Sequence, residues 1–213
     1  MTIGIVDYGM GNLRSVQKAI EKVGGAATIL RHADEADTVE KLILPGVGSF
    51  ADAMDNLWAG GWVGAVQRFA HTGKPTLGIC LGMQLLCEAS EEEAPAGELV
   101  KGIGLVAGVV RRLTVDREPD RLKVPHMGWN RLEWTRDDPL LAGLATPADH
   151  EPPSVYFVHG YHVPTDVPDV SATCTYGHPI AATLWRENLW ATQFHPEKSQ
   201  RVGLKILANF VAL

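Results

Sequence analysis

The chain has 213 residues, of which 46% are hydrophobic and 21% are charged, and its formal net charge is −6. That length suits one sizeable α/β domain, so we predict a single domain over residues 1–213. The acidic balance argues against nucleic-acid binding, and no segment approaches the roughly 18 apolar residues of a membrane span. Three irregularly spaced cysteines argue against a disulfide framework. Because the first residues also lack a basic leader, we expect a cytoplasmic protein.

Short apolar runs alternate with helical spacing through the first part of the chain. The pattern predicts strands at 3–6, 26–30 and 41–44, a further strand leading to Cys80, and helices at 13–23 and 63–71. This alternation is typical of a parallel sheet with right-handed crossovers. Ligands of such sheets bind at the carboxyl ends of the strands. The segments 7–12 and 45–48 and the residue Cys80 all lie at such ends.

The second half of the chain has a different character. It contains short segments separated by turn residues, which is typical of a β-rich region. Strands are predicted near 105–115, 122–134, 154–158, 170–176, 180–185 and 189–194, and a last amphipathic helix near 200–210. The composition does not change sharply enough to indicate a second domain.

Cys80 lies in a Gly78-x-Cys80-x-Gly82 run directly after an apolar segment. A side chain at a strand-to-helix turn stands on a sharp bend, and glycines two residues before and after it relieve the crowding. A helix beginning after Cys80 would aim its free N–H groups at the sulfur and favour the thiolate. The run therefore predicts a nucleophile elbow with cysteine. A buried cysteine in an ordinary βα unit is the alternative that this run alone leaves open.

A cysteine nucleophile needs a base, and the base needs a group that orients it. His195 follows a predicted strand, and Glu197 stands two residues later. In an extended segment residues i and i+2 face the same side, so we expect Glu197 to reach the ring nitrogen turned away from sulfur. Pro196 disfavours a helical backbone at His195. We predict a Cys80–His195–Glu197 triad, although His195 and Glu197 alone would also fit a surface ion pair.

Acyl transfer also needs N–H donors for an oxyanion. Leu81, the residue after the nucleophile, is one expected donor. The second is expected from the turn that contains Gly46, Val47 and Gly48, because glycine lets the backbone approach a substrate closely. A tight βα turn without this role is the alternative.

Two runs together, GICLGMQ (78–84) and FHPE (194–197), resemble the class I, or triad, glutamine amidotransferases. Three more, DYGMGN (7–12), VPHMGWN (124–130) and YFVHGY (156–161), resemble the glutaminase subunits of imidazole glycerol phosphate synthase. The resemblance covers the chain from residue 3 to residue 201. It implies a three-layer, flavodoxin-like α/β fold with a mostly parallel central sheet and extra β-rich segments in the second half.

The resemblance also implies a reaction. Cys80 would attack the carboxamide of glutamine, and His195 would protonate the departing ammonia and help water to hydrolyse the γ-glutamyl thioester. Glu197 would hold His195 in its productive orientation. The products are glutamate and ammonia, and no cofactor is implied.

By the family pattern, the α-amino and α-carboxylate groups of glutamine would be held by Gly48, Gln84 and the run His159, Gly160 and Tyr161. Relatives often carry serine or threonine where this chain has Gly160. We therefore expect a backbone contact at that position.

The family partner is a (β/α)₈ barrel cyclase that receives the ammonia through a channel and makes imidazole glycerol phosphate and AICAR in histidine biosynthesis. On this resemblance we expect a heterodimer. The residues expected at or near its interface are Tyr8, Asn12, Trp129, Tyr156 and Lys198. Each also has an ordinary alternative, since tyrosine and tryptophan are often core residues and a lone lysine is often solvated.

Other functions remain as alternatives at this stage. The chain would serve another synthase if it belonged to a different amidotransferase subfamily, but VPHMGWN and YFVHGY disfavour that. A cysteine peptidase would use the same triad and would need an open cleft for polypeptide. A degenerate binding domain would lack a triad member, and all three are present. No metal site is predicted, because His126 and His159 stand in no cluster with ligand spacing.

Overall fold

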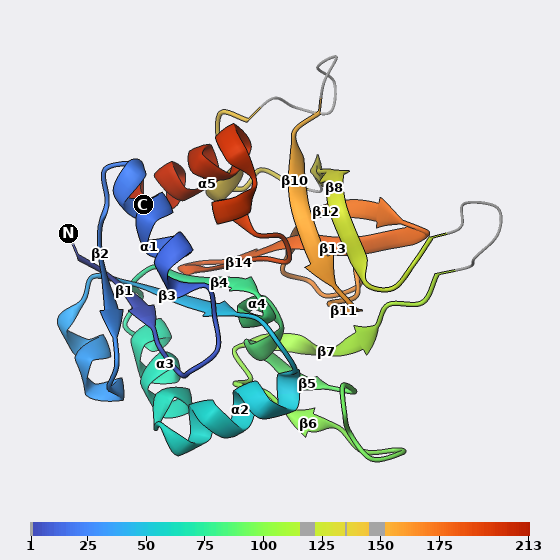
Figure 1. Cartoon of the computed structure of the whole chain (residues 1–213), viewed down its shortest axis with the longest axis horizontal. Helices are drawn as coiled ribbons and strands as arrows, with labels where there is room; N and C mark the ends of the chain where they lie inside the picture. The colour runs from blue at the N-terminus through green and yellow to red at the C-terminus, as the bar shows by residue number, and fades with distance from the viewer. Residues whose placement is uncertain (1, 116–121, 135, 145–151) are drawn as a thin grey trace.

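The computed structural model describes residues 2–115, 122–134, 136–144 and 152–213. Within these residues the central sheet has the strand order β2-β1-β3-β4-β14-β13-β12-β9 (Figure 1). The five strands from β2 to β14 run parallel, and β13, β12 and β9 continue the sheet with antiparallel pairing. In chain order their bounds are β1 Thr2–Val6, β2 Ala26–Leu30, β3 Lys41–Gly46, β4 Thr76–Cys80, β9 Glu133–Trp134, β12 Val170–Tyr176, β13 His178–Arg186 and β14 Leu189–Thr192.

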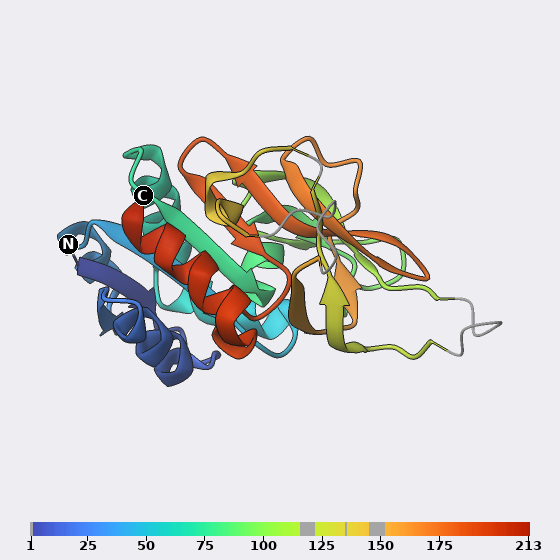
Figure 2. The ribbon, with the colours of Figure 1, turned by 90° about the horizontal axis from the view of Figure 1, so that it is seen from above.

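Helices cover both faces of the parallel part of the sheet, which gives three layers (Figure 2). Helices α1 and α5 lie against each other on one face, and α2 and α3 pack with the opposite core. The short helix α4 follows β4 directly. The helix bounds are α1 Leu13–Lys22, α2 Phe50–Ala59, α3 Trp62–His71, α4 Leu81–Leu85 and α5 Gln200–Ala212.

Strand β3 shows how the sheet separates two hydrophobic cores. Successive side chains of a strand point to opposite faces. Leu42 and Leu44 belong to the core under α2 and α3, whereas Ile43 between them belongs to the core under α1 and α5. All three side chains are fully buried. A strand covered on both faces therefore appears in the sequence as a continuous apolar run.

Two smaller sheets lie beside the central one. One has the order β11-β7-β5-β6, and the other contains only β10 and β8, which pair antiparallel. We call this pair the β8–β10 ribbon. Its register places Tyr156 opposite Trp129 and His159 opposite His126. The bounds are β5 Cys87–Ser90, β6 Val100–Lys101, β7 Val106–Arg112, β8 His126–Arg131, β10 Ser154–His159 and β11 Tyr161–His162.

The α/β fold with a mostly parallel central sheet is confirmed, and each strand and helix that the sequence predicted is present. The prediction was incomplete, because it omitted α2, β5, β6, β11 and the 3-10 turn Ala33–Thr38. It also ended the third strand at residue 44, whereas β3 continues to Gly46. The single domain stays a prediction. No helix among the described residues is long and apolar enough to cross a membrane.

Candidate active site

Cys80 stands on a strained turn between β4 and α4. Its backbone has φ 55° and ψ −110°, a conformation that L-residues rarely adopt. A Cβ at Gly82 would lie 1.8 Å from the Leu44 carbonyl oxygen, and one at Gly78 would lie 2.8 Å from the Gly82 carbonyl oxygen. Both flanking positions therefore require glycine, and the Gly-x-Cys-x-Gly run follows from backbone packing around the bend.

His195 follows β14 with an extended backbone, at φ −95° and ψ 98°. Its Nδ1 lies 2.8 Å from Oε1 of Glu197, and the two side chains are only 2% and 1% exposed. We expected an extended backbone from His195 to Glu197. That expectation was wrong, because Pro196–Lys198 forms a 3-10 turn. Proline fits the first position of such a turn, and the turn brings Glu197 back to the ring.

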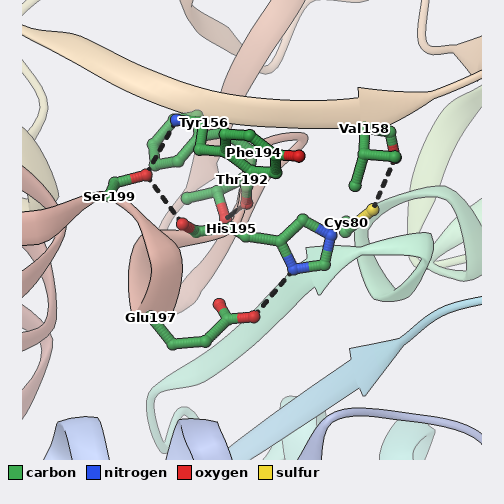
Figure 3. A network of polar contacts seen from close by, with 8 residues as sticks. All are labelled: Cys80, Tyr156, Val158, Thr192, Phe194, His195, Glu197 and Ser199. Carbon is green, nitrogen blue, oxygen red and sulfur yellow. Dashed lines mark hydrogen bonds and ion pairs between the residues drawn. The ribbon is translucent and has the colours of Figure 1, made fainter. Parts of the chain in front are cut away.

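Cys80 and the other ring nitrogen of His195 face each other (Figure 3). Within the described residues Nε2 of His195 has no partner with hydrogen-bond geometry, and Sγ of Cys80 lies 3.8 Å from the Val158 carbonyl oxygen. Burial lowers the pKa of His195, but the adjacent Cys80 and Glu197 outweigh burial and raise the pKa to about 9. The ring therefore sits in a setting that favours its protonated form.

The backbone of His195 is attached to the β8–β10 ribbon. Its amide donates to the Tyr156 carbonyl at 2.9 Å. The Ser199 hydroxyl donates to the His195 carbonyl at 2.7 Å and accepts from the Tyr156 amide at 2.9 Å (Figure 3). Ser199 is fully buried, so neither bond competes with solvent. These contacts hold His195, which follows β14, against β10.

The expected oxyanion donors lie around the Cys80 turn. Gly46 pairs with Cys80 across β3 and β4, and Leu81 begins α4. Gly46 has no room for a side chain, because a Cβ would lie 2.5 Å from the Tyr8 hydroxyl and 2.9 Å from the Leu81 Cβ. Val47 is 39% exposed at the end of β3. Their role as donors stays a prediction.

A cavity of about 170 Å³ lies beside Cys80. Drug-sized ligands occupy about 300–1,000 Å³, so this cavity suits a smaller molecule. It is lined by Val47, Gly48, Cys80, Leu81, Gln84, Glu92, Val158, His159, Gly160, Tyr161 and His195. We call it the Cys80 pocket. The structure thus brings the expected substrate residues together, with the exception of Gly46, which lines a narrower space behind Val47.

Glu92 is a pocket residue that the sequence analysis missed. It lies within the acidic run 91–93, where nothing local distinguishes it from its neighbours. Its Oε2 accepts from the Phe50 amide at 3.0 Å, and burial raises its pKa. No lysine or arginine is found among the described residues that line the pocket. Glu92 therefore gives the pocket an acidic side.

Two of the five expected interface residues, Trp129 and Tyr156, lie on the β8–β10 ribbon, and Lys198 of the Pro196–Lys198 turn lies beside them. Trp129 is 49% exposed and its ring centroid lies 6.1 Å from that of Tyr156. The Lys198 ammonium lies 6.0 Å from the Tyr156 ring centroid. We call Trp129, Tyr156 and Lys198 the aromatic patch. Its role in binding a partner stays a prediction.

The other two expected interface residues lie elsewhere. Tyr8 is only 6% exposed, and its hydroxyl has no hydrogen-bond partner within the described residues. Its side chain packs against Gly46 and does not reach the surface. Asn12 precedes α1 and lines the narrow space that Glu197 also borders. No group of three metal-ligating side chains occurs within the described ranges.

Comparison with known proteins gives the family. Residues 4–213 match the family described as Glutamine amidotransferase class-I. The chain is 49% identical over 211 residues to the imidazole glycerol phosphate synthase subunit HisH of Syntrophotalea carbinolica, covering 98% of both chains. It is 48% identical to the same subunit of Geobacter sulfurreducens, covering 98% of this chain and 97% of that protein.

Solved structures show the same fold at low sequence identity. A crystal structure described as a glutamine amidotransferase has a TM-score of 0.71 at 17% identity, covering 99% of both chains. The structure of PurLQS from Thermotoga maritima has a TM-score of 0.69 at 19% identity, covering 99% of this chain and 97% of that one. The matched family and the two HisH relatives show that the chain is an enzyme and belongs to the HisH branch of the class I glutamine amidotransferase family.

Proposed function

We propose that the chain hydrolyses glutamine at Cys80 and supplies the ammonia to a (β/α)₈ cyclase in histidine biosynthesis. The observation that carries this proposal is the buried alignment of Cys80, His195 and Glu197 beside a small pocket. A nucleophile, a base and an orienting group in this order supply the side-chain groups that acyl transfer uses, and N–H donors for the oxyanion complete the site.

The hydrogen bond to Glu197 sets the form of the neutral His195 ring. Nδ1–H donates to the Glu197 carboxylate, so Nε2 is the free acceptor that takes the Cys80 proton. The thiolate attacks the carboxamide carbon of glutamine, and the tetrahedral intermediate places its oxyanion near the N–H groups of Leu81 and Val47. Nε2–H then gives its proton to the leaving nitrogen, and ammonia departs. A γ-glutamyl thioester on Cys80 remains.

Hydrolysis of the thioester uses the same groups in reverse. Nε2 of His195 takes a proton from water as the oxygen attacks the thioester carbonyl. The carbon–sulfur bond breaks, glutamate leaves, and the proton returns to the sulfur of Cys80. The raised pKa of His195 supports this cycle, because the imidazolium that forms at each step is the form that its surroundings favour.

The pocket supports glutamine as the substrate. Glu92 offers an anionic partner for an α-ammonium group, and it is close enough to Cys80 to line the same cavity. The amide nitrogen of Gln84 is committed to the Tyr161 carbonyl at 2.8 Å and to Oε1 of Gln193 at 3.0 Å. Its oxygen Oε1 is the group left for a ligand. A cavity of about 170 Å³ disfavours the peptidase alternative, which needs an open groove.

The aromatic patch supports a protein partner. Large exposed aromatic side chains are common anchors of protein interfaces. Both named relatives are subunits of imidazole glycerol phosphate synthase, and a subunit assembles with other chains. We propose that the partner here is the cyclase, which docks on the ribbon that holds His195.

A glutaminase assay of the purified chain, alone and with the cyclase and its substrate, tests both parts of the proposal. We expect glutamate release that the partner stimulates and that Cys80→Ala abolishes. Glutamate release by Cys80→Ala would refute the nucleophile. Hydrolysis that the cyclase leaves unchanged would point to another synthase as the partner.

A further inference from the structure

A continuous chain of hydrogen bonds leads from the β8–β10 ribbon to the Cys80 pocket and includes none of the candidate triad. It begins at Asn130, whose Nδ2 lies 2.9 Å from the Thr175 carbonyl oxygen and 3.4 Å from Nε2 of His126. Nδ1 of His126 lies 3.0 Å from Nε2 of His159. Nδ1 of His159 lies 2.9 Å from the Tyr161 carbonyl oxygen. We call this series of hydrogen bonds the histidine relay.

The last acceptor sets the direction of every bond in the relay. A carbonyl oxygen only accepts, so Nδ1 of His159 carries the hydrogen that points to Tyr161. In a neutral ring the other nitrogen is then an acceptor, so Nδ1 of His126 donates to it. Nε2 of His126 is in turn an acceptor, and the Asn130 amide donates to it. Both nitrogens of both rings are thereby used.

This arrangement needs two neutral rings, and their surroundings keep them neutral. Burial lowers the pKa of His126 to about 4. Burial is also the main cause that lowers the pKa of His159 to about 3. A proton added to His159 would place two N–H groups against each other, so protonation would break the relay at that bond.

Aromatic rings hold His126 in place on both sides. The ring stacks on Phe157 at 4.7 Å between centroids and on Tyr176 at 4.0 Å, with interplanar angles of 21° and 24°. His126 is only 2% exposed. The stacking fixes the plane of the ring, and the hydrogen bonds to His159 and Asn130 fix its edge, with Nδ1 directed at His159.

The relay ends on a group that also holds Gln84. The Tyr161 carbonyl accepts from Nδ1 of His159 and from Nε2 of Gln84 at 2.8 Å. A shift of this carbonyl would turn the Gln84 amide and move the oxygen that it presents to the pocket. The His159 ring itself is fully committed, so any contact of His159 with glutamine comes from its backbone.

We propose that His126 is a positioning residue for glutamine binding, acting through His159 and the Tyr161 carbonyl on the amide of Gln84. This inference rests on the proposed function, because it takes glutamine as the ligand of the Cys80 pocket. His126 does not line that pocket. Its loss should therefore weaken substrate binding while the triad keeps its geometry.

Two substitutions separate the hydrogen bond from the stacking. His126→Phe keeps an aromatic ring between Phe157 and Tyr176 but leaves Nε2 of His159 buried without a donor. His126→Asn loses the stack but keeps an amide N–H near the position of Nδ1. We expect His126→Phe to raise the KM for glutamine about tenfold and to change kcat less than about twofold, measured with the cyclase present. We expect His126→Asn to keep KM within about threefold of the unmodified chain.

Tyr176→Leu is the matched control, since it removes one stacking ring and leaves the relay bonds. It should lower the unfolding temperature and leave KM unchanged. An equal rise of KM in Tyr176→Leu and His126→Phe would show that His126 acts through packing alone, which contradicts the proposal. An unchanged KM in His126→Phe would overturn the proposal outright. Glutamine binding to Cys80→Ala, measured by calorimetry with and without His126→Phe, should give the same ranking without turnover.

The unmodified chain supplies a test that needs no substitution and no activity. Nitrogen-15 NMR of the histidine rings should show the hydrogen on Nδ1 for both His126 and His159. A hydrogen on Nε2 of His159 would refute the relay. A chain that hydrolyses no glutamine would instead refute the proposed function, and the NMR result would still decide the relay.

Discussion

The backbone amide of His195 donates to the carbonyl of Tyr156 over 2.9 Å, which joins the candidate base to the β8–β10 ribbon. The same strand carries the Val158 carbonyl near Cys80 and the backbone of His159 at the pocket. β10 therefore contacts the nucleophile, the base and the substrate pocket. A partner that displaced the ribbon would change all three at once.

The three candidate triad positions should differ in how much turnover they support. Cys80→Ala should abolish glutamine hydrolysis, because no other thiol lines the pocket among the described residues. His195→Ala should lower kcat by about 10²–10⁴-fold, the usual contribution of general acid–base catalysis. Glu197→Gln should cost less than His195→Ala, because it orients the ring and does not react. Steady-state glutaminase kinetics decide the order, and a fully active His195→Ala protein would exclude His195 as the base.

The pKa of His195 should depend on Cys80. The folded pKa of about 9 lies above the ordinary value of 6.5, so the protonated ring stabilises the fold. That stability is fully present below the unfolded value and is lost as the pH rises through about 9. Cys80→Ala removes one cause of the rise and leaves burial, so the folded pKa should fall and the loss of stability should be complete at a lower pH. NMR titration of His195 and urea unfolding between pH 6 and 10 measure both effects, and an unchanged pKa would contradict this account.

Gly82→Ala should destabilise the fold by about 3 kcal/mol, because its Cβ would meet the Leu44 carbonyl oxygen at 1.8 Å and the backbone would have to move. Gly64→Ala is the matched control within α3. There the nearest atom to a new Cβ is the flexible end of Arg68 at 3.4 Å. We expect that control to stabilise the chain by about 0.5–1 kcal/mol. Urea unfolding of the two variants should therefore show shifts of opposite sign.

Gly160→Ser should improve glutamine binding. A Cβ at Gly160 meets only Val124 Cγ1, at 3.7 Å, and the backbone does not lie in the left-handed region. Because Gly160 lines the pocket, the new hydroxyl can hydrogen-bond a charged end of glutamine. We expect KM to fall about fivefold, the equivalent of roughly 1 kcal/mol. Gly160→Ala, which adds the carbon without the hydroxyl, should leave KM unchanged, and an equal fall in both variants would show that the hydroxyl is not responsible.

As an interface anchor, Trp129 should contribute about 2 kcal/mol or more to binding of the cyclase partner. Trp129→Ala should therefore raise the Kd of the complex about thirtyfold. Trp129 is half exposed and does not line the pocket, so hydrolysis by the chain alone should keep its rate. Calorimetry of the two proteins gives the affinity. Trp58 is a suitable control, since it is 59% exposed on α2, away from the ribbon. An equal loss of affinity for Trp58→Ala would show that neither effect is specific.

Some features were predictable because they are dictated locally. The Gly-x-Cys-x-Gly run predicted the turn at Cys80, since only glycine fits beside that bend. Helix α2 was predictable as well, although it was omitted: Ser49 caps it, and its buried residues are Phe50, Ala53, Met54 and Leu57. That spacing is helical.

Other features have no local signal. The strands β6 and β11 contain two residues each, and their partners in the sheet define them. Glu92 reaches the pocket because of the course that its loop takes. The acidic residues on either side of it give no sign of that course. His126 and His159 stand 33 positions apart and meet because β8 and β10 pair in one register. Such contacts depend on tertiary structure and cannot be inferred from residue type and spacing.

Two glycines, Gly48 and Gly160, line the Cys80 pocket, and the Val158 carbonyl lies beside Cys80 there. A wall of this kind keeps its shape when neighbouring side chains are exchanged. Point substitution therefore has few positions from which to redirect the enzyme toward a different amide. Insertions or deletions that change the course of the loops after β3 and β10 should alter substrate preference more often than point substitutions do. Libraries that vary loop length should therefore yield more altered specificities than libraries that vary residue type.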